Sequence, residues 1–388
     1  MADITAIICE YNPFHKGHKY QLNKVKELYP HTKIVSVMSP SFMQRGRPAV
    51  FDKFVRGEAA ARGGADLVVS MPQVFAILSA EGFAEGGVRV AKALGATALA
   101  FGVENDEINA IIDIAKILIS DKFENEIKTE LALTPELSYP IIRQKVLERF
   151  TKHAHLVETP NNILAIEYAK AAMKFCPEMK LVPIKRCGND HNSTNKTGDI
   201  LSASAIREMM STKGWEEHLP NATRIAIEGA NILDFTKFNA FLFSALTVAD
   251  YDKILFSTGN KELADMIFSE IRRKGDYNSF RKSLSRKRFT ESKIDRALLS
   301  VILEIGYDEY MHKTPEYATL LAMSDGGREI IKSTEIEIIS KHAGIKDLKS
   351  KQAEKELLAD RIWARCSAAP SGEEYFINKR PFLREELK

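Results

Sequence analysis

The stretch CEYNPFHKGHKYQL, residues Cys9 to Leu22, lies where a predicted strand gives way to a predicted helix. The apolar run Ile4–Ile8 precedes it, and apolar residues with helical spacing follow it. Between the two, an Asn-Pro pair favours a turn, and His15 and His18 stand on either side of a Lys-Gly pair. At a spacing of three, the two imidazoles share one face of the first helical turn, in a junction that we expect to be exposed.

Strand-like and helix-like segments alternate through the first 105 residues. The strand-like runs are apolar throughout, as is typical of strands that are covered on both faces. This alternation predicts an α/β fold with a Rossmann-like parallel sheet and right-handed crossovers. The predicted strands span residues 5–9, 33–38, 66–70 and 96–101, and the predicted helices span residues 18–29, 51–62 and 79–94.

The later segments continue this pattern and then leave it. Residues 107–155 predict a helical insertion, which is followed by a helix at 161–175 and a fifth strand at 180–185. A polar loop is expected at 188–198, and a further helix begins at Ser202. Beyond this point the pattern is mainly helical. We therefore predict two domains, residues 1–215 around the sheet and a mainly α-helical C-terminal domain at residues 216–388.

The bulk composition is that of an ordinary soluble globular protein. The chain has 388 residues, of which 45% are hydrophobic and 28% charged, and a net charge of +3. It contains no apolar run of about 18 residues and no recognisable signal peptide, so we expect no membrane partner. None of the four cysteines forms a CxxC pair, and no metal site is predicted. The cysteine usage favours the cytoplasm.

The HxGH pattern formed by His15, Gly17 and His18 follows the first predicted strand. Parallel sheets bind ligands beyond the carboxyl ends of their strands, where helix N-termini attract anions. Imidazole N–H groups at that place could donate to phosphate oxygens, and Gly17 would let an adenine base approach the backbone. The alternative is a helix start with two exposed histidines. The chain has neither a GxxxxGK nor a GxGxxG motif, which argues against P-loop and dinucleotide sites.

A second candidate phosphate site is the segment LSASAIRE, residues 201–208. Ser202 and Ser204 are suited to capping the helix that follows, and its first N–H groups would form a phosphate cradle. Arg207 would add a charged donor. The alternative is an ordinary capped helix.

Two polar regions are candidate RNA contacts. Gln44, Arg45 and Arg47 follow the second predicted strand and suit a phosphate or the RNA backbone, although a solvated turn is the alternative. Residues 272–296 carry ten positive charges with Tyr277, Phe280 and Phe289 among them, which predicts an RNA surface with aromatic rings for stacking. A solvated helix face is the alternative. The candidates in this stretch are Arg272, Arg273, Lys274, Arg286, Lys287 and Arg288.

The HxGH motif and the serine-rich helix start together resemble the nucleotidyltransferase superfamily. Further stretches resemble the tRNA(Met) cytidine acetate ligase family over nearly the whole chain. They are EYNPFHKGH (10–18), MSPSFMQRGRPAVFDKFVR (38–56), GADLVVSMP (64–72), SAEGFAEGGV (79–88), FGVEND (101–106), PNNILAIEYAKA (160–171) and SRKRFTESKIDRALL (285–299). The chain departs from the family pattern at Pro40, at Val103 and in the loop 186–195.

This resemblance implies an activity. Members of the family use ATP to activate acetate as acetyl-adenylate, with release of pyrophosphate. They then transfer the acetyl group to the N4 amine of the wobble cytidine of elongator tRNA(Met), which gives N4-acetylcytidine. ATP, together with Mg²⁺, is the expected cosubstrate, and acetyl-CoA is not used. The N-terminal domain would then activate acetate and the C-terminal domain would bind tRNA, without a protein partner.

The resemblance also implies site residues. His15, His18 and Arg207 would be catalytic. Glu104 follows the fourth strand and is a candidate ligand for Mg²⁺ or a surface carboxylate, and one of Asn161 and Asn162 is expected to cap a helix. The implied ATP contacts are Ile8, Cys9, Glu10, Tyr11, Asn12, Pro13, Phe14, His15, Gly17, His18, Gln21, Gly102, Asn162, Arg186, Ser202 and Ser204.

Two other functions remain open at this point. A small-molecule nucleotidyltransferase or a pantothenate-synthetase-like ligase would use the same HxGH motif and serine-rich helix start. The basic C-terminal region argues against it, because a small substrate does not require such a surface. A non-catalytic RNA-binding module with a relic nucleotide fold is the other alternative, and the intact motif residues argue against it.

Overall fold

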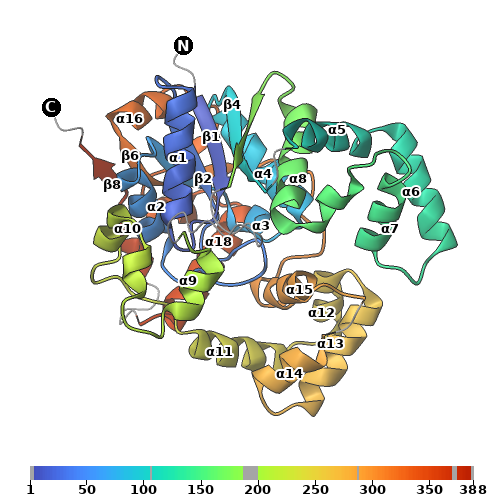
Figure 1. Cartoon of the computed structure of the whole chain (residues 1–388). Helices are drawn as coiled ribbons and strands as arrows, with labels where there is room; N and C mark the ends of the chain where they lie inside the picture. Colours follow the sequence, from blue (N-terminus) through green and yellow to red (C-terminus); the bar gives the residue numbers. More distant parts are fainter. Residues whose placement is uncertain (1–3, 105–106, 187–199, 286–287, 369–373, 386–388) are drawn as a thin grey trace.

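The computed structural model describes residues 4–104, 107–186, 200–285, 288–368 and 374–385. A mixed sheet lies at the centre of the molecule, with helices on both faces and a group of helices below its lower edge (Figure 1). The strands are β1 (Ile4–Cys9), β2 (Lys33–Met38), β3 (Leu67–Ser70), β4 (Ala98–Val103), β5 (Lys180–Lys185), β6 (Tyr317–Ser324), β7 (Glu337–Ile339) and β8 (Phe382–Arg384). The helices are α1 (Lys16–Leu28), α2 (Lys53–Arg62), α3 (Gln73–Ala76), α4 (Ala80–Ala93), α5 (Ile108–Leu118), α6 (Asp121–Leu133), α7 (Tyr139–Leu147), η1 (Ala154–Glu158), α8 (Pro160–Phe175), α9 (Ala203–Met209), η2 (Trp215–His218), α10 (Asn221–Ala226), α11 (Phe235–Thr247), α12 (Tyr251–Thr258), α13 (Lys261–Arg273), α14 (Tyr277–Ser283), α15 (Glu291–Leu303), α16 (Asp325–Ile331), α17 (His342–Asp347), α18 (Lys351–Cys366) and α19 (Glu374–Ile377).

The sheet has the strand order β5-β4-β1-β2-β3-β6-β7, with β8 paired to β6. The first five strands of the chain are mutually parallel, whereas β6 is antiparallel to β3. The predicted α/β fold with a mainly parallel sheet is confirmed. From β1 the chain adds strands on one side as far as β3 and then crosses to β4 on the other side of β1. The carboxyl ends of β1 and β4 therefore form a topological switch point, where such sheets bind ligands.

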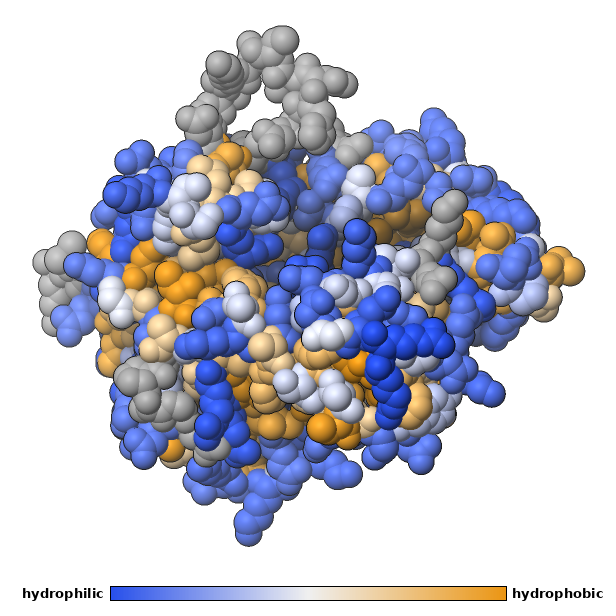
Figure 2. Space-filling model, turned by 90° about the horizontal axis from the view of Figure 1, so that it is seen from below, coloured by the Kyte–Doolittle hydropathy of each residue, from blue (hydrophilic) through white to orange (hydrophobic). Residues whose placement is uncertain are grey.

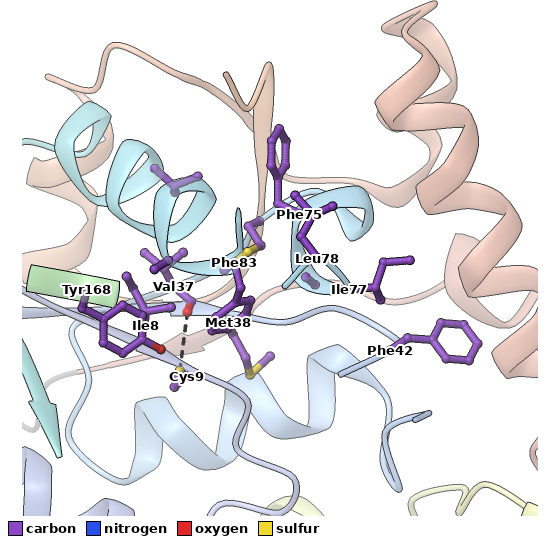
Figure 3. Close-up of a cluster of buried hydrophobic side chains, with 14 of the residues drawn as sticks. Ile8, Cys9, Val37, Met38, Phe42, Phe75, Ile77, Leu78, Phe83 and Tyr168 are labelled. Atoms are coloured by element: carbon purple, nitrogen blue, oxygen red, sulfur yellow. Dashed lines mark hydrogen bonds between the residues drawn. The ribbon is translucent and has the colours of Figure 1, made fainter. Parts of the chain in front are cut away.

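The core on one face of the sheet fixes the strand ends that lead into the switch point. Ile8 and Val37 of the neighbouring strands β1 and β2 pack with Phe75, Leu78 and Phe83 of the segment that spans α3 and α4 (Figure 3). All five side chains are buried. Because the strands are closely packed, polar functional groups are placed in the loops that follow them.

The predicted elements of the first 186 residues match the observed ones in type. The strands at 33–38 and 180–185 have the predicted bounds, and the insertion at 107–155 is helical. The short helix α3 was not predicted, and the polar loop predicted at 188–198 lies outside the described residues.

The C-terminal part differs from the prediction. Residues 221–303 form helices as expected, but β6, β7 and β8 then return to the central sheet. The predicted boundary at residue 215 therefore does not separate the sheet from a helical region. A buried ion network also joins the two parts: the Lys53 ammonium of α2 lies 2.6 Å from carboxylate oxygens of both Glu356 and Asp360 of α18. No helix formed by the described residues has the length and apolar character needed to cross a membrane.

Candidate active site

The candidate site lies at the carboxyl edge of the parallel strands. β1 begins near the N-terminus at the top of Figure 1 and runs downward, so this edge faces the helices at the bottom. Figure 2 views the molecule from below and shows a hollow near the centre of the face, with hydrophilic residues along much of its rim. The HxGH loop leaves β1 here and Glu104 follows β4, which places both at the switch point.

The two histidines form a stacked pair at the start of α1. His15 is the N-cap residue, and its Nδ1 accepts a hydrogen bond of 3.0 Å from the Gly17 amide. His18 Nδ1 accepts a bond of 3.2 Å from the His15 amide, which completes a reciprocal capping box. The ring centroids lie 3.7 Å apart with an angle of 25° between the planes. The helix start thus fixes both rings by main-chain hydrogen bonds.

Burial, nearby charges and these hydrogen bonds together determine the protonation state of the two imidazoles. Burial, assisted by the positive charges of Arg186 and Arg207, lowers the pKa of His15 to about 3. Burial also holds the pKa of His18 well below its usual range, with further lowering by His15 and Arg186. Both rings are therefore neutral near pH 7, and each accepts at Nδ1. A neutral imidazole that accepts at Nδ1 carries its proton on Nε2, so each ring has an Nε2–H donor.

The neutral state of His15 predicts a pH-dependent stability. Between the unfolded pKa of about 6.5 and the folded pKa of about 3, the unfolded chain binds a proton that the folded chain does not. Stability is thus fully present above pH 6.5 and declines as the pH falls toward 3. Between pH 7.5 and 5.5, wild type should lose about 1.4 kcal/mol more unfolding free energy than His15→Asn. Urea titrations at both pH values measure this difference, and equal losses would contradict a buried neutral ring.

One expectation about this motif is corrected. The junction is not exposed, because only 4% of the His15 surface is accessible. At Gly17, a Cβ would lie 2.8 Å from Cε1 of His15 and 3.5 Å from the Ile200 side chain. The His15 ring therefore fills the direction that a side chain would take, whereas the predicted approach of an adenine base to this backbone stays a prediction. Glycine is required so that the ring can fold back onto the helix start.

The rest of the opening loop is held by its own contacts. Asn12 accepts a bond of 2.9 Å from the Val50 amide through its side chain, and the Phe14 carbonyl accepts one of 2.7 Å from Thr223. Most of the predicted ATP contacts in this stretch point into the core, so the main chain is what they can offer a nucleotide. The buried residues are Ile8, Cys9, Tyr11, Asn12 and Phe14. Pro13 is buried as well, whereas Glu10 and Gln21 are half-buried.

The serine-rich helix start lies against the HxGH loop. Ser202 is the N-cap of α9 and accepts from the Ala205 amide, and its hydroxyl lies 3.0 Å from that of Ser204. Both serines are exposed. Arg207 donates a bond of 2.7 Å to the Asn12 carbonyl, and its charge lowers the pKa of His15. The guanidinium thus joins α9 to the loop, a role that was not predicted from the sequence.

The loop after β4 supplies the other wall of the site. Both predicted caps of α8 bind Glu104 instead: Asn161 donates to its carboxylate at 2.5 Å, and Asn162 accepts from its amide at 3.1 Å. Thr159 is the N-cap, without a side-chain bond, so the capping prediction is wrong. A Cβ on Gly102 would lie 3.1 Å from the Arg186 side chain, so glycine at this position leaves room for that arginine.

The polar loop after β2 is largely committed to the fold. The Gln44 amide donates to the Glu10 carboxylate at 2.9 Å, and the Arg47 guanidinium forms a 3.0 Å ion pair with Asp295. Arg45 and Arg47 are both exposed, and the positive charge of each lowers the pKa of Arg207. Both guanidinium groups are therefore accessible near the site, although Arg47 is also paired with Asp295.

The basic stretch is only partly available. Phe280 and Phe289 are buried in the core, so the prediction that they stack on RNA bases is wrong. Arg288 forms an ion pair with Glu262. Arg272 and Arg273 are exposed, and the Arg272 guanidinium lies over the Phe268 ring at 3.3 Å. The remaining candidates are Lys274, which is half-buried, and Arg286 and Lys287, which lie outside the described residues.

Two loop contacts were not predicted. Thr223 and Arg56 bind main-chain oxygens of the loops at this edge. Arg56 ends the family-like stretch 38–56, but no role was predicted for it or for Thr223. Their partners are carbonyl groups, which leave no trace in the sequence. Within the described residues, His, Cys, Asp and Glu side chains form no group of three or more able to hold a metal ion.

Comparison with known proteins first gives the class to which the chain belongs. A sequence model of the HIGH Nucleotidyl Transferase family matches residues 2–375. A tRNA(Met) cytidine acetate ligase of Acetivibrio thermocellus is 30% identical over 97% of this chain and 99% of its own length. One from Thermotoga maritima is 34% identical over 83% of this chain and 82% of its own length. The chain thus belongs to the tRNA(Met) cytidine acetate ligase family of HIGH nucleotidyltransferases, as its sequence motifs indicated.

Solved structures give the same result. The crystal structure of Thermotoga maritima TmcAL in its apo form I has a TM-score of 0.89 and 30% sequence identity, and the alignment covers 99% of this chain and 100% of that one. The form II crystal of the same protein, bound with alpha-thio ATP, has a TM-score of 0.87 and 29% identity with the same coverage.

Proposed function

We propose that this protein is an ATP-dependent ligase that forms acetyl-adenylate and transfers the acetyl group to the N4 amine of the wobble cytidine of elongator tRNA(Met). The products would be N4-acetylcytidine, AMP and pyrophosphate. The observation that carries the proposal is the pair of neutral, stacked imidazoles at the switch point, each with an Nε2–H donor. The relatives named tRNA(Met) cytidine acetate ligase, which match over most of the chain, support the substrates.

ATP would bind across the switch point. His15 and His18 would donate to its phosphates, and the exposed hydroxyls of Ser202 and Ser204 would contact them from the other side. The charges of Arg186 and Arg207, which both act on the His15 ring, suit a polyanion. The alpha-thio ATP complex of the Thermotoga maritima relative supports a nucleotide in this fold.

The proposed chemistry follows from these donors. Attack of an acetate oxygen on the α-phosphorus would form the acetyl–phosphate bond and break the bond to the β-phosphate, so that pyrophosphate leaves. The donors aimed at the phosphates would stabilise the charge that develops on the leaving group. The cytidine amine would then attack the acetyl carbonyl, with AMP as the leaving group. Holding acetate in line would offset its weak nucleophilicity.

The proposed reaction also involves a metal ion and an acyl donor. Mg²⁺ would accompany the triphosphate, and Glu104 is the candidate carboxylate for it because it directly follows β4. Acetate, and not acetyl-CoA, would supply the acyl group. The three described cysteines are buried free thiols, which suits the reducing cytoplasm that we propose as the compartment.

The tRNA would approach the site from the side viewed in Figure 2. Arg45 is exposed and its charge acts on Arg207, whereas the exposed Arg272 and Arg273 of α13 offer contacts further away. Phosphate contacts of this kind position an RNA without reading its sequence.

The proposed function is tested by incubation of the protein with ATP, acetate and total tRNA, followed by digestion and mass analysis of the nucleosides. N4-acetylcytidine should appear only when ATP and acetate are both present, and it should map to elongator tRNA(Met). With isotopically labelled acetate, the product mass should shift by the label. Formation of the product from acetyl-CoA without ATP, or its absence under all conditions, would contradict the proposal.

A further inference from the structure

Arg56 is a buried arginine whose described hydrogen bonds all go to main-chain oxygens. It lies in the first turn of α2 and is 1% exposed. Its Nη1 donates to the Glu10 carbonyl at 2.7 Å and to the Ser39 carbonyl at 3.0 Å, and its Nε donates to the Phe51 carbonyl at 3.0 Å. Its Nη2 donates to the Pro40 carbonyl. One guanidinium therefore joins the loops after β1 and β2 to the start of α2.

The bonding pattern is unusual for a buried charge. Buried guanidinium groups are normally paired with a carboxylate, because desolvation of an unpaired charge is costly. Burial lowers the pKa of Arg56 to about 10, so the group is still charged near pH 7. Carbonyl dipoles accept all of its described hydrogen bonds, and the negative charges of nearby groups, first among them Asp52, favour its charged form. Five N–H groups in a fixed fork can hold several carbonyls at once, which lysine cannot do.

The contact to Glu10 leads directly to the histidines. The next residue, Tyr11, has a φ of +47°, a left-handed conformation that is strained for a non-glycine residue. Such a conformation persists only where its surroundings hold it. The Tyr11 ring contacts the His18 ring with centroids 4.8 Å apart, and His18 stacks on His15. A shift of the Glu10 carbonyl would therefore reach both imidazoles.

We propose that Arg56 is a positioning residue of the active site, which fixes the main chain after β1 so that both imidazoles point their Nε2–H donors at the substrate. The expected effect of Arg56 on the reaction rate rests on the proposed function, whereas its expected effect on the orientation of the two imidazole rings does not. The residue does not touch the reacting atoms. It acts through Glu10 and Tyr11.

The test compares Arg56→Lys with Arg384→Lys. Arg384 is the control, because it donates at 2.5 Å to the Ala61 carbonyl at the far end of the same helix and is paired with Asp66 away from the site. Arg56→Lys keeps the positive charge but loses the branched guanidinium that binds several carbonyl groups at once. We expect its kcat for acetate-dependent pyrophosphate release to fall by about 10- to 100-fold, since a displacement of about 1 Å has effects of this size. Arg384→Lys should lower only the melting temperature.

Imidazole nitrogen NMR provides a readout that a purely structural role would not change. In the wild type, His15 and His18 should each show a protonated Nε2 and an accepting Nδ1, and in Arg56→Lys at least one ring should lose that pattern below the melting temperature. Wild-type spectra in Arg56→Lys would overturn the inference, as would a wild-type kcat. Loss of the fold in both Arg56→Lys and Arg56→Gln would also overturn it, because Arg56 would then support the whole fold. An inactive wild type would refute the proposed function only, and the spectra would still decide the role of Arg56.

Discussion

Replacement of His18 by asparagine is expected to lower acetate-dependent pyrophosphate release by about 100- to 1,000-fold, the usual effect of removing a preorganised donor to a developing charge. The amide oxygen of the introduced side chain can still accept from the His15 amide in place of Nδ1, so the helix cap remains. The donor at the Nε2 position is lost. Release of pyrophosphate in the absence of tRNA, measured as initial rates over a range of ATP concentrations, quantifies the effect.

The matched control is His18→Gln, whose amide reaches the Nε2 position and leaves the Nδ1 position empty. His18→Gln should retain more activity than His18→Asn. Its capping of the start of α1 should be weaker, because no side-chain atom accepts from the His15 amide. Both variants should remain folded at the assay temperature, as judged by thermal unfolding. A wild-type rate in His18→Asn, or equal losses in the two variants, would show that the Nε2–H donor does not act in the reaction.

Reversal of charge at Arg272 and Arg273 is expected to weaken tRNA binding and to reduce its salt dependence. Each lost phosphate contact removes roughly 0.7 to 0.9 from the slope of log affinity against log salt concentration, so two contacts remove about 1.4 to 1.8. Affinity of Arg272→Glu/Arg273→Glu for tRNA, measured across a salt series, gives the slope. Pyrophosphate release without tRNA should be unchanged, because neither residue belongs to the switch point.

Lys332→Glu is the control for this experiment. Lys332 is exposed and directly follows α16, at the sheet edge opposite to the site. Its substitution should leave the salt slope as it is in the wild type. A slope that stays unchanged in the double variant, or that falls equally in the control, would show that α13 makes no specific contact with tRNA.

The first half of the fold was predictable because its signals are local. β2 and β5 are short, mainly apolar segments, and each is followed or preceded by a helical pattern. β6, with the sequence YATLLAMS, is also mainly apolar, and periodicity alone does not distinguish such a segment from a buried helix. Its assignment depends on antiparallel pairing with β3, about 250 residues earlier in the chain, a long-range contact that no local pattern carries.

The site was predictable where chemistry uses side chains in a motif. The stacked pair of His15 and His18 lies at the predicted strand end. The contacts that orient the motif use main-chain oxygens as acceptors, so the sequence shows only the donors, Arg56 and Arg207. The aromatic residues of the basic stretch were misassigned for a related reason. The residue type alone does not show whether a phenylalanine is buried or exposed, because tertiary packing decides it, and both Phe280 and Phe289 are buried.

The most direct test of the account is the fate of oxygen in acetate labelled with oxygen-18 in its carboxyl group. Attack of acetate on the α-phosphorus of ATP bridges the two groups through a labelled oxygen, which stays with phosphorus when the cytidine amine takes the acetyl group. One labelled oxygen should therefore appear in AMP and none in pyrophosphate. Label that is absent from AMP, or ADP and phosphate as the products, would contradict adenylation at the switch point.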